Sequence, residues 1–289
     1  EDAGLSTKVE RGNRIFPVSD KASDVVDTLV RILKSFGGRL LTNAKVNKIL
    51  LKNQKVSMVN TLINGKQEVF PADAIILATG GASYPGTGST GDGFVLAEDC
   101  GHSLVPILPA LVPIESDSEY IAALQGLSLK NVQASICADN KVLAKEFGEM
   151  IFTHFGFSGP IILSLSKMIA AHLATSHKAL DLVIDLKPAL DLHKLDLRLQ
   201  RDFQQYSRKQ LINAMVDLLP GRLIPVVIDS AFLNEEKPVN QLSKEERARL
   251  AFSLKNLSFS ITGTRPLREA IVTAGGISTK EINPKTMAS

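Results

Sequence analysis

The sequence predicts an α/β fold, with a further region of short strands that fits a small β-barrel or sandwich and a helical segment. Three observations carry this prediction. A helical pattern followed by a β-meander opens the chain, and a continuous apolar run, "AIILA" (74–78), comes next. The periodicity then changes from strand-like to helical near residue 191. Continuous apolar runs of this length are typical of strands buried inside a parallel sheet.

The composition is that of a globular protein without a membrane or nucleic-acid partner. The chain has 289 residues, 44% of them hydrophobic and 22% charged, with a net charge of +3. Residues 194–255 hold 11 Lys or Arg against 8 Asp or Glu, a surplus typical of a solvated helix face. No apolar run reaches the length of a membrane span, and no signal peptide is visible. We therefore expect a cytoplasmic protein.

The N-terminal part predicts one amphipathic helix and one meander. The segment "SDKASDVVDTLVRILKSFGG" places a set of apolar residues on one helical face, and Gly37–Gly38 ends the pattern. That apolar set is Val25, Val26, Leu29, Ile32, Leu33 and Phe36. The runs "KVNKILL", "KVSMVNTLI" and "KQEVF" follow as strands. Asn64–Gly65 separates the last two, and this pair is a strong hairpin signal because both residues tolerate positive φ.

The rest of the chain predicts strands, then helices, then a return to strand. Short strand-like runs such as "KNVQASICA" and "ALDLVIDL" fill residues 106–190. One helix is expected from Pro160, with Ser158 as its N-cap. Helical patterns occupy residues 191–254, where Ser243-x-x-Glu246 forms a capping box before the last helix. The prolines of "LPALVPIES" argue against a regular strand there.

The segment "GTGSTG" (86–91) matches the template of a dinucleotide-binding turn. That turn requires a strand ending directly at the first glycine and an acid at the end of a second strand. Here "GGASYP" separates the apolar run from Gly86, and Glu115 lies among prolines. An accidental match is the preferred interpretation, and phosphate binding by this loop is the alternative.

Longer blocks of the sequence resemble a known family. The order helix, meander and apolar strand ending in "ATGG" is similar to the second half of the FAD-binding domain of glutathione-reductase-type flavoproteins. The blocks "LATGGASYPGTGSTGDGFVLAEDCGH", "FTHFGFSGP" and "TAGGISTKEINPKTM" resemble a bacterial flavoprotein family. That family includes aminoacetone oxidase and the BaiN-type reductases of bile-acid metabolism. The matching blocks follow the family's order along nearly all of the chain.

The resemblance implies a domain organisation. Residues 1–105 and 267–289 would form part of a glutathione-reductase-like FAD-binding domain. Residues 106–190 and 255–266 would form the inserted β-barrel, and residues 191–254 the helical bundle. The family's N-terminal G-x-G-x-x-G turn and its C-terminal flavin-binding segment have no counterpart in this sequence. The resemblance therefore implies that the chain is the internal part of an FAD-dependent protein.

The resemblance also implies cofactor-binding residues. The turn of Thr79, Gly80 and Gly81 would contact FAD, as would Asp92 and the glycine pair Gly275–Gly276. Val46 would pair its backbone with the adenine. The alternatives are a tight turn without ligand for residues 79–81, a helix cap for Asp92 and an ordinary strand residue for Val46.

His154, in the block "FTHFGFSGP", is the candidate for a catalytic residue. Imidazole titrates near neutral pH, so proton transfer is one interpretation. A structural role is preferred because no acid motif accompanies it. The two cysteines and the other histidines lack metal-ligand spacing, and we expect no metal.

The predicted function is oxidation or reduction of a small-molecule substrate through FAD, with NAD(P)H as a possible electron donor. The alternative is a non-enzymatic module that binds a partner or RNA through the basic helical segment. Such a module needs aromatic residues interleaved with Lys and Arg. The aromatic residues of this segment are spaced for a helix core, so we expect no nucleic-acid partner.

Overall fold

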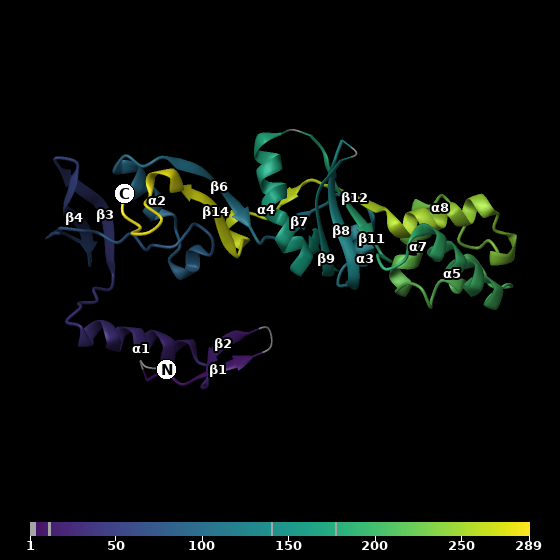
Figure 1. The fold of residues 1–289 in the computed structure, drawn as a ribbon, viewed down its shortest axis with the longest axis horizontal. Coiled ribbons are helices and arrows are strands. Elements are labelled where there is room, and N and C mark those ends of the chain that lie inside the picture. Colours follow the sequence, from purple (N-terminus) through teal and green to yellow (C-terminus); the bar gives the residue numbers. More distant parts are fainter. Residues whose placement is uncertain (1–3, 11–12, 140, 177) are drawn as a thin grey trace. The chain divides into compact units, whose positions relative to one another are not determined.

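The computed structural model describes residues 4–10, 13–139, 141–176 and 178–289. The chain folds into two compact units, Glu1–Ile76 and Leu77–Ser289 (Figure 1). The first unit is a hairpin, a helix and a meander. Its elements are β1 (Thr7–Glu10), β2 (Arg14–Pro17), α1 (Ala22–Ser35), β3 (Ala44–Lys52), β4 (Lys55–Ile63) and β5 (Lys66–Pro71).

The predicted meander is confirmed. Strands β3, β4 and β5 form an antiparallel three-stranded sheet in that order. Asn64 and Gly65 connect β4 to β5 with φ of 49° and 82°. Both values are positive, as a two-residue hairpin turn that follows the strand twist requires.

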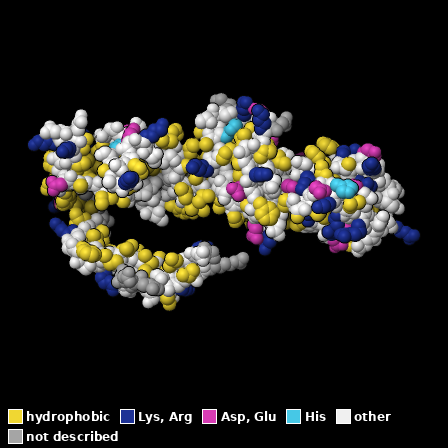
Figure 2. All heavy atoms as spheres, viewed as in Figure 1, with side chains coloured by type: hydrophobic (Ala, Val, Ile, Leu, Met, Phe, Trp, Pro, Cys, Tyr) yellow, Lys and Arg dark blue, Asp and Glu magenta, His cyan; other side chains and the backbone are white. Residues whose placement is uncertain are grey.

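The predicted helix α1 is also confirmed, but its apolar face is open within its own unit. Leu29 is 61% exposed and Phe36 is 86% exposed. Hydrophobic side chains are visible along α1 in Figure 2. The sequence pattern thus gave the correct helix, and several residues of its apolar stripe are exposed.

The expected strand at residues 74–78 is wrong. The segment that leads into Thr79, Gly80 and Gly81 has no strand assignment, and Ile76 is 92% exposed. A buried parallel strand needs hydrogen-bonded neighbours on both sides. No described strand pairs with this run, so its apolar composition alone does not make it part of a sheet.

The second unit contains a curled sheet with a buried core. Among the described residues its strands follow the order β12-β11-β8-β9-β10-β7-β13. The strands at the two ends of this order, β12 and β13, are separated in sequence by Thr262 alone, so the sheet must curl until its ends meet. The elements are β7 (Ile114–Glu115), α3 (Tyr120–Leu124), β8 (Ser128–Ala138), β9 (Lys141–Phe152), β10 (Gly156–Ser158), α4 (Pro160–Thr175), β11 (Leu180–Asp185), β12 (Leu257–Ile261) and β13 (Gly263–Thr264).

Three phenylalanines form the aromatic part of this core. Phe152 and Phe157 are fully buried, and Phe259 is 2% exposed. Their ring centroids lie 5.1–5.7 Å apart in tilted and edge-to-face arrangements, which aromatic pairs prefer. The expected inserted barrel therefore has a close-packed interior.

Helix α4 packs against this barrel through Ile161, Leu165 and Ile169, all of which are buried. Its N-cap is Gly159, with Pro160 as the first helical residue. The expectation that Ser158 caps the helix is wrong, because Ser158 is the last residue of β10 and pairs with Ile151.

The change to helical structure near residue 191 is confirmed. The helical segment contains α5 (Leu192–Gln205), α6 (Leu211–Ala214), η2 (Gly221–Leu223), α7 (Ile224–Ser230), η3 (Val239–Gln241) and α8 (Lys244–Lys255). Its apolar residues join those of the barrel in one buried cluster, which includes Leu195, Leu199, Val227 and Leu250. Within the described residues, no helix combines the length and apolarity needed to cross a membrane.

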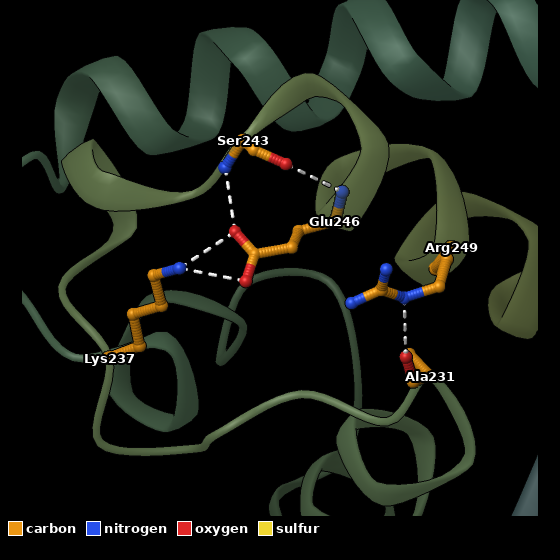
Figure 3. A network of polar contacts seen from close by, with 5 residues as sticks. All are labelled: Ala231, Lys237, Ser243, Glu246 and Arg249. Carbon is orange, nitrogen blue, oxygen red and sulfur yellow. Dashed lines mark hydrogen bonds and ion pairs between the residues drawn. The ribbon is translucent and has the colours of Figure 1, made fainter.

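Helix α8 begins with the predicted capping box (Figure 3). The Ser243 hydroxyl accepts the Glu246 backbone N–H at 3.1 Å, and the Glu246 carboxylate accepts the Ser243 N–H at 2.7 Å. Lys237 donates to both oxygens of that carboxylate, which lowers the pKa of Glu246. Nearby, Arg249 donates to the Ala231 carbonyl oxygen.

Two further contacts connect the segment between β7 and β8 to the helices. The Tyr120 hydroxyl of α3 donates to the Asp229 carboxylate of α7. Arg222 donates to the Gln125 carbonyl oxygen at 2.8 Å. The hydrogen bond to Asp229 raises the pKa of Tyr120 to about 12. The neutral phenol is therefore the form that the folded protein favours.

The capping box predicts a measurable loss of stability on removal. Ser243→Ala leaves the Glu246 N–H without its acceptor and is expected to lower the free energy of unfolding by about 1 kcal/mol. Lys244→Ala, at the exposed neighbouring position, is the control and should change it by less than about 0.5 kcal/mol. Urea denaturation of both variants measures this. Equal effects would mean that the box contributes nothing.

The Tyr120–Asp229 contact predicts a pH dependence. In a protein whose Tyr84 and Tyr206 are replaced by Phe, phenolate absorbance should report Tyr120 titrating near pH 12. Asp229→Asn should bring this pKa toward its ordinary value near 10. The contact stabilises the fold below that ordinary pKa, and its contribution is lost as the pH rises through the folded-state value. A midpoint that Asp229→Asn leaves unmoved contradicts the assignment.

Candidate functional site

The candidate site is built on a two-stranded sheet that joins distant parts of the second unit. Strand β6 (Leu104–Ala110) pairs antiparallel with β14 (Val272–Ile277). Pro109 of "LPALVPIES" lies inside β6, as does Pro106, so the expectation that the prolines of that segment prevent a regular strand is wrong for residues 108–110. Proline is tolerated on an edge strand, and β6 pairs with β14 alone in this sheet.

Thr273 of β14 fixes the turn that contains the expected cofactor residues. Its hydroxyl accepts the backbone N–H groups of Ala82 at 2.9 Å and Ser83 at 3.0 Å, and donates to the Ser83 hydroxyl at 3.2 Å. A Cβ on Gly81 would lie 2.5 Å from this same hydroxyl oxygen. Gly81 therefore lacks a side chain because Thr273 occupies that space.

The helix after the turn starts where the sequence predicts. Helix α2 (Asp92–Asp99) follows Gly91, whose φ is 86°. Gly93 is buried against Thr79, where any Cβ would overlap the threonine hydroxyl. Asp92 is the first residue of the helix and half-buried, while Gly91 holds the N-cap position. The interpretation of Asp92 as a cap is thus corrected: its carboxylate acts on the positive end of the helix dipole.

The glycine pair of β14, like Gly81, lies where neighbouring atoms leave no room for a side chain. Gly275, with φ of 83°, sits at a β-bulge where an added Cβ would lie 2.0 Å from the Pro106 carbonyl oxygen. Gly276, with φ of 100°, lies against the Phe94 ring of α2, 2.6 Å from where its Cβ would be. These glycines allow α2 and β6 to approach β14.

The "GTGSTG" loop lies between the turn and the helix. Its first residues form the short helix η1 (Pro85–Thr87), and no strand ends at Gly86. The loop is therefore not the strand-to-helix turn of a dinucleotide fingerprint, as the sequence spacing predicted. A Cβ on Gly86 or Gly88 would meet nothing within 4 Å, so this loop presents bare backbone to open space.

The structure thus brings together Thr79, Gly80, Gly81, Asp92, Gly275 and Gly276. Val46 lies in the other unit, on β3. Its strand is an edge of its sheet, and a register shift follows Val46 directly. The backbone edge of β3 that faces away from β4 pairs with no described strand, which is the arrangement that pairing to a nucleobase requires.

His154 is placed in the turn between β9 and β10 and is exposed. Its ring makes an edge-to-face contact with Phe155, at 4.8 Å between centroids. Arg265 also lies over the Phe155 ring, with its guanidinium 4.7 Å from the ring centroid. Among the described residues no acid is hydrogen-bonded to the His154 ring.

Arg265 is a residue that the sequence reasoning missed. It donates to Glu115 at 2.8 Å and makes two bonds of 2.9 Å to Glu269. The two carboxylates raise the pKa of Arg265, Glu269 more strongly, and Arg265 lowers the pKa of Glu269. The spacing of Arg265 and Glu269, four residues apart, was the available signal. The contact with Glu115 joins residues 150 apart in sequence, and no sequence signal indicated it.

The residues around the turn fit a nucleotide cofactor in one respect and not in another. Thr79 and Gly80 are exposed, and the backbone of Gly86 and Gly88 faces open space beside them. A phosphate or ribose group can approach such backbone. The Cβ positions of Gly81, Gly275 and Gly276 are filled by protein atoms, so these glycines serve the packing of the site. Among the described residues, no group of three or more His, Cys, Asp or Glu is placed to hold a metal ion.

Removal of the Thr273 hydroxyl tests the construction of this site. Thr273→Val keeps the side-chain shape but leaves the Ala82 and Ser83 N–H groups without an acceptor. We expect amide hydrogen exchange at both residues to accelerate and stability to fall by about 1–3 kcal/mol. Thr175→Val, which removes a hydroxyl bonded within α4, is the control. Unchanged exchange at Ala82 and Ser83 would show that Thr273 does not hold the turn.

Comparison with known proteins gives both a family and individual relatives. A family model described as "HI0933-like protein barrel and H2TH domain" matches residues 108–272, which is more than half of the chain. The 3-dehydro-bile acid delta(4,6)-reductase of Clostridium scindens is 29% identical over 286 residues, covering 99% of this chain and 68% of that protein.

Two further relatives are named ribosomal RNA dihydrouridine synthase. The Haemophilus influenzae protein is 29% identical over 273 residues, covering 93% of this chain and 63% of its own length. The Escherichia coli protein is 30% identical over 215 residues, covering 74% of this chain and 50% of its own length. The chain thus spans between half and about two thirds of these relatives. The match across the barrel and the helices places the chain in the HI0933-like family, as the resemblance to BaiN-type reductases implied.

Proposed function

We propose that this chain is part of an FAD-dependent oxidoreductase that reduces a small organic substrate. The observation that carries the proposal is the convergence of Thr79–Gly81, Asp92 and Gly275–Gly276 in a member of this family. The first two groups would hold FAD. When bound, the flavin supplies the redox chemistry, which side chains alone do not provide.

The names of the relatives support a reduction. One relative is named a reductase, and the others are named for making dihydrouridine, which is uridine with one carbon–carbon double bond reduced. We therefore propose a conjugated carbon–carbon double bond as the group reduced and NAD(P)H as the electron donor. His154 packs on Phe155, and we propose a structural role for it.

The charges of the helical segment favour a small-molecule substrate over a nucleic-acid partner. Six of its basic residues form ion pairs within the fold: Lys194, Arg198, Arg201, Lys237, Arg247 and Lys255. Paired cations are poor donors to phosphates, because each contact breaks an existing pair. We therefore propose a small-molecule substrate in preference to a nucleic-acid partner.

The full-length protein tests the proposal directly. It should carry stoichiometric flavin absorbance and should consume NADH or NADPH when a conjugated enone is added. Uridine-containing RNA is the competing substrate, and its conversion to dihydrouridine would identify the alternative. Absence of bound flavin would reject the proposal altogether.

Asp92 gives this test a matched pair of variants. Asp92→Ala removes a carboxylate at the N-terminus of α2, and we expect FAD retention to fall about tenfold, as for loss of one charge-assisted contact. Asp99→Ala changes the opposite end of the same helix and should retain FAD as the parent protein does. FAD retention is measured by equilibrium dialysis. Equal retention by both variants, with equal loss of melting temperature, means that Asp92 acts on the helix alone.

A further inference from the structure

Two stretches of chain connect the β6–β14 ribbon to the barrel, and we call them the neck. Residues 111–113 run from β6 to β7, and residues 265–271 run from β13 back to β14. The stretches approach each other where the Arg265 N–H donates to the Pro113 carbonyl oxygen at 2.9 Å. They are the two covalent connections between residues 114–264 and the rest of the chain.

The first stretch of the neck contains a strained residue. Leu111 has φ of 51°, a region in which the Cβ of an L-residue crowds the backbone. Its carbonyl oxygen accepts the Ile271 N–H of the second stretch at 3.1 Å. The next residue, Val112, is fully buried, and its N–H donates to the Ser166 hydroxyl of α4 at 3.1 Å. Such a conformation persists only where the surroundings fix it, so the direction in which the chain enters the barrel is set at this residue.

The Arg265 side chain bonds to segments on both sides of the neck. Its Nη1 donates at 2.8 Å to Glu115, which lies in β7 just after the first stretch. Its Nε and Nη2 donate at 2.9 Å each to Glu269, which ends η4 (Leu267–Glu269) in the second stretch. The guanidinium also lies 4.7 Å from the ring centroid of Phe155, in the turn between β9 and β10. We call Arg265, Glu115 and Glu269 the clamp.

The geometry of the clamp matters more than its strength. The Arg265 side chain is 29% exposed, and those of Glu115 and Glu269 are 34% and 37% exposed. Ion pairs with this access to water contribute little to stability, because solvent screens them. A guanidinium that is bound along one edge by a carboxylate and stacked on a ring is nevertheless held in one plane. Breaking the clamp is therefore expected to change the angle at the neck while both folded parts remain intact.

The clamp lies within reach of the proposed cofactor site. Ala110 pairs with Val272, next to Thr273, whose hydroxyl accepts two N–H groups from the turn that follows Gly81. Glu115 follows Ala110 by five residues, so their α-carbons lie at most about 18 Å apart. A rotation at the neck would therefore move the barrel rim relative to that turn. Misplacement of a bound substrate by about 1 Å is enough to slow a reaction about 10²-fold.

We propose that Arg265 is a positioning residue of the proposed reaction. Through the clamp it fixes the angle at the neck, and with it the place of the barrel rim at Phe155 relative to the cofactor-binding turn. In this role Arg265 touches neither the cofactor nor the substrate. The inference rests on the proposed function for its effect on the reaction, whereas the angle at the neck can be measured without a cofactor.

A distance measurement across the neck tests the clamp. Cys100 follows α2 and Cys137 lies in β8, so these two free cysteines are on opposite sides of the neck. In the full-length protein, with any other cysteines replaced by Ser, spin labels on both should give a narrow distance distribution by pulsed electron paramagnetic resonance. Arg265→Gln should broaden this distribution or shift its mean. Arg268→Gln, at an exposed position of η4, is the matched control and should leave it as in the parent. A distribution that Arg265→Gln leaves unchanged would overturn the proposal.

Kinetics test the consequence for the reaction. Arg265→Gln should hold FAD and keep its melting temperature at the parent level, while kcat for the enone falls about tenfold to hundredfold. Arg265→Lys keeps the charge but not the planar fork, and should recover only part of the rate. A parent protein without flavin would overturn the proposed function and this role with it. A parent-like kcat in an Arg265→Gln protein that holds flavin would overturn this role alone.

Glu269→Gln keeps the proposal testable if Arg265→Gln fails to fold. It removes the charge that accepts two of the three hydrogen bonds of the clamp and leaves the guanidinium in place. The same change in the distance distribution and the same loss of kcat are expected, each smaller than for Arg265→Gln. Distances and rates that both match the parent in Glu269→Gln would equally contradict the assignment.

Discussion

The second unit depends on the pairing of β6 with β14. These strands hold residues 104–110 against residues 272–277, and Thr273 extends the contact to Ala82 and Ser83. Without the two hydrogen bonds of that hydroxyl, the turn at Thr79–Gly81 would have no partner on this side. The helix α2 would then lose the surface on which Phe94 and Gly276 meet. One side chain therefore connects the start of the unit to its end.

Close approach of backbone explains the glycines of the site. Gly81, Gly93 and Gly276 each face a side chain of the protein, namely Thr273, Thr79 and Phe94. A nucleotide would therefore meet the exposed faces of Thr79, Gly80, Gly86 and Gly88. The glycines of this region thus serve two purposes. Some allow close packing, which fixes the loop, and others leave the outer backbone of the loop accessible.

Local signals in the sequence predicted local structure well. The Asn64–Gly65 turn, the Ser243–Glu246 capping box and the strands of the barrel were recognisable because neighbouring residues determine them. The prediction of a strand at residues 74–78 failed because hydrogen bonding to neighbouring strands decides whether an apolar segment is a strand. Composition does not encode that pairing. Strand β6 was missed for the opposite reason: its prolines are tolerated on an edge, and its partner lies far along the chain.

The candidate site was predictable only through the family resemblance. The hydrophobic periodicity of the sequence does not indicate that Gly275 or Gly276 lies near Thr79, because a long-range β-pairing brings these residues together. Arg265 was missed for the same reason, since it follows β13 and its partner Glu115 lies in β7, 150 residues earlier in the sequence. Residues whose roles arise from tertiary contacts carry weak signals in a single sequence.

The placement of the barrel and helices between β6 and β14 has a kinetic consequence. Ala110 pairs with Val272, so this pairing closes a loop of roughly 160 residues, at an entropic cost of about 4.5 kcal/mol for a flexible chain. A barrel that folds first shortens the effective loop, because its own ends then emerge close together. Folding should accordingly proceed from the inside outward, with the β6–β14 ribbon and the turn at Thr79–Gly81 ordering last. The region proposed to meet the cofactor would be the final part of this unit to acquire its shape.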